Sequence, residues 1–149
     1  MIGKTALIVV ASSFFSVGAL QLGAEDTTAR ARLIGAWQPK DLAVKDAGIW
    51  TLERKAADVI HITYVVGDEK TIELECETTG KDCKMKDSGK TATVSMWFSG
   101  PNLVSLETRG DAVVKRRFGV EDGGWLQVEI IPIQPNGKTE KAEFRRIRP

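Results

Sequence analysis

The side chains best suited to chemistry in this chain are one arginine in an apolar strand pattern, two cysteines and a single histidine. In the segment 112–121, Arg116 shares its parity with three apolar residues, Val114, Phe118 and Val120. An inward arginine is costly unless it is paired, and a guanidinium can hold a carboxylate through two hydrogen bonds. Arg116 is therefore a carboxylate receptor in a cavity, a member of an internal ion pair, or a strand-end residue that reaches water. A bulge near Gly119 that reverses the parity is a further alternative.

The two cysteines, Cys76 and Cys83, lie seven residues apart. A redox motif would place two residues between them, and a zinc site would need four ligands with only His61 to help. In an oxidising compartment, an even pair at this spacing predicts a structural disulfide across a hairpin whose tip is 78–81. Two free thiols are the alternative.

Catalysis has little support in the sequence. His61 falls on an outward strand face, the acidic residues are expected mostly on solvent faces, and the motifs of serine hydrolases and zinc proteases are absent. A near-neutral balance of 21 basic and 20 acidic residues argues against a chain that neutralises nucleic-acid phosphates. The Lys115–Arg117 cluster does not change this, because alternation splits it across two faces. The sequence predicts no enzyme, no metal, no cofactor and no nucleic-acid partner.

The first 24 residues have the pattern of a secretory signal peptide. Lys4 precedes an uncharged apolar stretch of about 13 residues that ends in small residues. A membrane anchor is the alternative, but a span needs about 20 apolar residues. We expect cleavage after Ala24, with Ala19 as the other candidate, and a secreted or periplasmic protein with no stable membrane anchor. Cleavage removes Lys4 and no acidic residue, which leaves a charge-balanced domain over 25–149.

Beyond the signal, apolar residues recur with period two between clusters of turn residues. One buried and one solvated face are typical of antiparallel sheets. We expect a helical turn within 27–33 and then eight to ten strands, at 33–44 (continuous or broken), 48–55, 58–66, 70–77, 82–86, 90–99, 102–108, 112–121, 124–133 and 139–148. The predicted fold is all-β, an antiparallel up-and-down barrel, because closure removes exposed strand edges. A sandwich is the alternative.

The two ends of this strand series carry complementary residues. Trp37, in a Gly-x-Trp that begins at Gly35, enters the first strand, and Arg146 lies on the inward face of the last. A guanidinium over an indole ring is a favourable contact, so Trp37 and Arg146 are predicted to close the barrel. In these three residues and the all-antiparallel meander the chain resembles the lipocalin-like (calycin) barrels. The resemblance implies the architecture and a Trp packed beneath an Arg of the final strand.

Three hypotheses of function follow from the faces of the strands. In the first, the barrel binds a small apolar ligand, with or without a carboxylate, at inward side chains: Arg116, Trp50, Tyr64 and Phe98. In the second, outward Trp97 and Trp125 and the hairpin tip bind a protein. In the third, the inward aromatics only fill the core. A neighbouring Lys or Arg stem that covers either outward Trp would argue against the second hypothesis.

Overall fold

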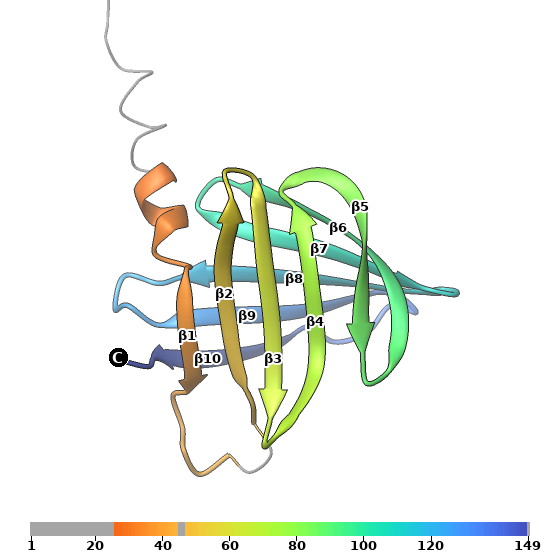
Figure 1. The fold of residues 1–149 in the computed structure, drawn as a ribbon. Coiled ribbons are helices and arrows are strands. Elements are labelled where there is room, and N and C mark those ends of the chain that lie inside the picture. The colour runs from red at the N-terminus through yellow and green to blue at the C-terminus, as the bar shows by residue number, and fades with distance from the viewer. Residues whose placement is uncertain (1–25, 45–46, 149) are drawn as a thin grey trace, which may run out of the picture.

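The computed structural model describes residues 26–44 and 47–148, so the predicted signal peptide at 1–24 lies outside the described residues. The chain forms a closed antiparallel barrel, in which every strand pairs with its sequence neighbours and β1 pairs with β10 (Figure 1). This confirms the predicted all-β barrel. The strands are β1 (Gly35–Pro39), β2 (Ile49–Ala56), β3 (Val59–Val66), β4 (Glu69–Glu77), β5 (Thr79–Asp87), β6 (Lys90–Ser99), β7 (Asn102–Arg109), β8 (Ala112–Val120), β9 (Leu126–Gln134) and β10 (Glu140–Arg146).

Alternation along each strand builds the core inside the barrel. In β4, Ile72, Leu74 and Cys76 are at most 8% exposed, while the glutamates between them face outward. The same parity holds in β3, β6 and β9. Burial of apolar side chains at about 25 cal/mol per Å² is the main force that stabilises such a core. The largest fully buried side chains are Trp37, Phe118, Leu33, Leu52, Ile62, Met85, Met96, Leu103 and Leu126.

Gly35, Trp37 and Arg146 meet at the seam between β1 and β10. The guanidinium of Arg146 lies 4.3 Å above the Trp37 ring, and it donates to the carbonyl oxygens of Ile34, at 2.7 Å, and Arg32. Gly35 has a φ of +144°, and a β-carbon there would lie 2.3 Å from Nη1 of Arg146. Only glycine therefore lets the chain pass beneath this guanidinium.

A short helix at 26–31 lies at the end of the barrel where β1 begins, beside this seam (Figure 1). Its Arg30 donates through Nε to the carbonyl of Gly100 at 2.8 Å, and the Trp37 indole donates to the carbonyl of Leu33 at 3.1 Å. These contacts fix the predicted helical turn to the barrel wall. Within 26–44 and 47–148, no helix combines the length and the apolar character that crossing a membrane requires.

Two strand boundaries differ from prediction by more than two residues. The first strand was expected to reach residue 44 but ends at Pro39, which has no amide hydrogen for the ladder. Asp41 then accepts a hydrogen bond from the amide of Ala43 at 3.0 Å, which starts a turn. The fifth strand is longer than the predicted 82–86, because the connection after Glu77 is very short and a bulge between Thr79 and Asp82 absorbs the bend.

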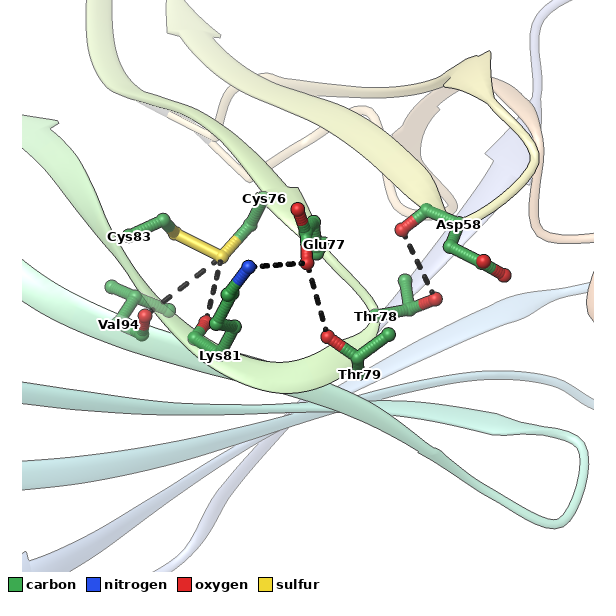
Figure 2. The surroundings of a disulfide bond; sticks show 8 residues. All are labelled: Asp58, Cys76, Glu77, Thr78, Thr79, Lys81, Cys83 and Val94. Carbon is green, nitrogen blue, oxygen red and sulfur yellow. Dashed lines mark hydrogen bonds and ion pairs between the residues drawn. A yellow bond between two sulfur atoms is a disulfide. The ribbon is translucent and has the colours of Figure 1, made fainter.

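The predicted disulfide between Cys76 and Cys83 is present, with the two Cα atoms 5.6 Å apart (Figure 2). The β4–β5 ladder ends at Leu74 and Met85, and the disulfide joins the next inward pair. Figure 2 also shows Glu77 accepting from Thr79 at 3.3 Å and pairing with Lys81 at 3.7 Å. The disulfide therefore joins the two strands where their backbone pairing has stopped.

Replacing both cysteines with alanine is expected to lower the free energy of unfolding by about 2–3 kcal/mol, since the crosslink closes a short loop in the unfolded chain. Urea unfolding followed by circular dichroism measures the change. The urea midpoint of the wild-type protein should approach that of the variant when a reductant is added. An unchanged urea midpoint in both samples would show that the disulfide does not stabilise the barrel.

Candidate functional site

The end of the barrel away from the helix contains a cavity of about 300 Å³. Its walls come from both halves of the barrel, and one rim is formed by exposed residues at the start of β10. The barrel interior is therefore hollow at the end away from the helix. The lining residues are Trp50, Tyr64, Ile72, Arg116, Val128, Ile130, Glu140, Lys141, Ala142 and Phe144.

An aromatic cluster forms one wall of this cavity. Trp50 stacks on Tyr64 with ring centroids 4.4 Å apart, and it meets the edge of Phe118 at 5.2 Å. Offset-stacked and edge-to-face pairs each add to the stability gained from burial. The amide of Gly48 donates to the Tyr64 hydroxyl at 2.8 Å, and a β-carbon at residue 48 would come within 2.8 Å of the Tyr64 ring. The glycine therefore lets the backbone hold Tyr64 in place.

Arg116 belongs to a chain of alternating charges inside the barrel. Its Nη1 donates to Glu107, whose other carboxylate oxygen accepts from Arg109 at 2.8 Å. Arg109 also donates to Asp87 at 2.7 Å. The hydrogen bond with Asp87 raises the pKa of the Arg109 guanidinium, and attraction by both carboxylates adds to this. The structure thus places Arg116 in the cavity wall and in an internal ion pair at once.

Glu107 is the functional residue that the sequence analysis missed. Glu107 is an exception to the expectation that most acidic residues lie on solvent faces, because its side chain is 7% exposed. Its parity with buried Leu103 and Ser105 was the available signal, and Ser105 is the partner of Arg116 in the β7–β8 ladder. Pairing two arginines with one carboxylate makes this burial tolerable.

The guanidinium of Arg116 keeps donor capacity that the protein does not use. Its Nε is buried and has no hydrogen-bond partner among the described residues. Glu107 is shared with Arg109, so it compensates Arg116 only in part. Besides this arginine, the cavity lining contains one acidic and one basic residue, Glu140 and Lys141. The site therefore offers an apolar, aromatic surface with one incompletely paired guanidinium.

Phe98, the fourth predicted ligand residue, does not line this cavity. It lies toward the helix end beside a second cavity of about 380 Å³, with the Arg30 guanidinium 4.6 Å above its ring. Trp97 lines the same second cavity and is half-buried. Trp125 is half-buried too, and Lys40 Nζ lies 4.3 Å above its ring. Trp125 is thus covered by a lysine.

His61 lies on the outer face, as its parity predicts, between two glutamates. Its Nδ1 is 3.5 Å from Glu53 and its Nε2 is 3.4 Å from Glu73. A hydrogen bond from Lys55 is the main cause that lowers the pKa of Glu53, and a hydrogen bond from His61 lowers the pKa of Glu73. The two glutamates are exposed and His61 is partly exposed, so the ion pairs of this cluster contribute little to stability.

No protein-family model and no curated protein sequence matches the chain. Solved structures of similar fold do exist. A secretory abundant heat soluble (SAHS) protein of Ramazzottius varieornatus aligns with a TM-score of 0.65 at 12% identity, over 78% of this chain and 96% of that one. The fluorescent protein UnaG aligns with a TM-score of 0.63 at 15% identity, over 78% and 98%. At such identities the likeness shows the fold alone, a closed antiparallel β-barrel, which agrees with the resemblance to calycin barrels noted at Gly35, Trp37 and Arg146.

Proposed function

We propose that this chain is an exported binding protein, not an enzyme, that holds a small apolar carboxylic acid in its cavity. The observation that carries the proposal is the meeting of Trp50, Tyr64 and Arg116 in one cavity wall. Ligand sites are mostly apolar hollows with a few placed polar groups, of about 300–1,000 Å³. At about 300 Å³ the cavity suits a compact ligand. Export is supported by the disulfide and by a structural neighbour described as secretory.

The surroundings of the cavity suit the entry of an apolar molecule. Val44 and Phe144 line an adjoining hollow of about 720 Å³ that shares three residues with the cavity. Exposed large hydrophobic side chains of the described segments gather at this end of the barrel: Leu42, Val44, Ile49 and Ile133. The apolar part of the ligand would replace water against Trp50 and Tyr64, and its carboxylate would give Arg116 a second partner beside Glu107.

Replacing Arg116 with methionine is expected to weaken binding of a carboxylic acid about tenfold, because a hydrogen bond between charged groups is lost. Binding of the matching methyl ester should change little. Both are measured by titrating medium-chain and aromatic acids, and their esters, against tryptophan emission, to which Trp50 in the cavity wall contributes.

The matched control is Arg117→Met, since Arg117 is the next residue on the outer face and lies 3.9 Å from Glu129. It should bind acid and ester as the wild type does. If no acid in the panel alters the emission, the proposed function is wrong. If Arg116→Met binds acids as tightly as the wild type, the carboxylate preference is wrong.

A protein-binding function through Trp97 and Trp125 has less support. Lys40 covers the Trp125 ring and also pairs with Glu143 at 2.8 Å. Trp97 lies on another part of the wall, beside the tip of the disulfide hairpin. The two indoles therefore form no common apolar surface of the kind that marks a protein interface.

A further inference from the structure

The outer wall has a hollow of about 690 Å³ where the end of β10 meets the turn between β8 and β9. Figure 1 shows this turn and the C-terminal end of the chain on the same side of the barrel. Gln38 pairs with Arg145 across the β1–β10 ladder, and the β9–β10 register places Trp125 beside Arg145. Arg148 follows β10, and Gly123 and Gly124 of the turn also line the hollow.

The polar groups that line this hollow are nearly all hydrogen-bond donors. They are guanidinium groups, the Trp125 indole N–H and the Gln38 amide, and no carboxylate is among the lining residues. Arg146 is the third lining arginine, but it is already committed to Trp37 and two carbonyl oxygens. Arg145 and Arg148 thus supply the available positive charge.

Neither Arg145 nor Arg148 forms an ion pair with any residue that the structure describes. The Nε of Arg145 is buried and has no partner in the described chain. The nearby Glu143 is taken by Lys40, which adds a further cation above Trp125. Glu121 fixes the turn through its backbone, bonded to Trp125 and Gly124 at 2.8 Å. The guanidinium groups of Arg145 and Arg148 line the hollow, so an acceptor supplied from outside would give their charges the partner that the described chain does not supply.

We propose that this hollow binds an oxyanion, a phosphate or sulfate group, either free or carried on a small molecule. Arginine suits such groups because its planar fork donates two parallel hydrogen bonds. Two unpaired guanidinium groups and an indole N–H around one hollow give an anion more than an isolated surface charge would. The site lies on the outer wall and is independent of the internal cavity and its ligand.

The indole N–H signals test this proposal directly, because the chain has four tryptophans and Trp125 alone lines the hollow. Inorganic phosphate and sulfate are titrated into ¹⁵N-labelled protein, with sodium chloride keeping the ionic strength constant. The signal that disappears in Trp125→Phe should shift in a saturable way. Glucose 6-phosphate compared with glucose tells whether an esterified phosphate binds as the free ion does.

Arg148→Gln and Arg145→Gln should each weaken binding about tenfold. Arg117→Gln removes the same charge elsewhere and should have no effect. If Arg145→Gln fails to fold, exposed Arg148 decides the result. The proposal is overturned if the Trp125 signal does not shift, or if Arg117→Gln weakens binding equally. A response of Trp50 instead would place the anion beside Arg116 and overturn it too.

Discussion

Glu107→Leu is expected to lower the free energy of unfolding by about 3 kcal/mol, the low end of the cost of breaking a buried ion pair. The substitution leaves Arg116 inside the barrel without its carboxylate, while Arg109 keeps Asp87. The low end applies because the Arg116 side chain is 14% exposed and water reaches part of it. Unfolding in urea measures the loss, with the same dependence of the unfolding free energy on urea concentration used for wild type and variant.

The double variant Glu107→Leu/Arg116→Met separates charge from packing. It removes both partners, and replacing a buried pair by apolar groups is often close to neutral. We therefore expect it to recover most of the stability lost in Glu107→Leu. If the double variant is as unstable as the single one, the shape of Glu107 matters and its charge does not. The double variant should also lose the preference for acids over esters.

Trp37→Ala is expected to cost about 3–5 kcal/mol, the usual range for removing a large aromatic side chain from a core. Trp37 is completely buried. Its ring packs against the Arg146 guanidinium, and its indole N–H donates to the carbonyl of Leu33. Its loss leaves a cavity at the helix end and removes the surface on which the seam closes. Thermal unfolding followed by circular dichroism gives the change.

Trp97→Ala is the matched control, since it deletes the same atoms from a half-buried position on the wall. It should cost clearly less than Trp37→Ala. Equal losses at the two positions would mean that Trp37 acts as ordinary apolar bulk and has no special part in closure. If the seam depends on this ring, the rate of amide hydrogen exchange in Trp37→Ala should increase more in β1 and β10 than in the other strands.

Much of the fold could be predicted because alternation is a local property of the sequence. The parity of Ile72, Leu74 and Cys76 fixes which face of β4 is buried, and turn residues mark most strand ends. The first strand was overestimated, because Pro39 and the Asp41 turn end it before its apolar pattern does. Closure was predictable from Gly35, Trp37 and Arg146, since a favourable guanidinium–indole contact can join the first strand to the last.

The candidate site was predicted less completely, because it depends on which strands face each other. Arg116, Trp50 and Tyr64 have inward parity, and the barrel brings them to one cavity. Phe98 has the same parity, but it lies at the helix end of the barrel, away from this cavity. Parity alone does not show at which end of the barrel a side chain lies. Glu107 was missed because a buried carboxylate is expected only where cationic partners compensate it, and its two arginine partners are known only from the structure.

The pairing of β1 with β10 has a consequence for the order in which the chain folds. Every other ladder joins strands that follow one another in sequence, so it closes a short loop at a small entropic cost. The β1–β10 seam joins Trp37 to Arg146 and must enclose almost the whole domain. Contacts of such long range slow folding, since their entropy is lost before their energy is gained. The barrel should therefore assemble as an open, curved sheet of hairpins, and closing the seam should be the late step that sets the folding rate.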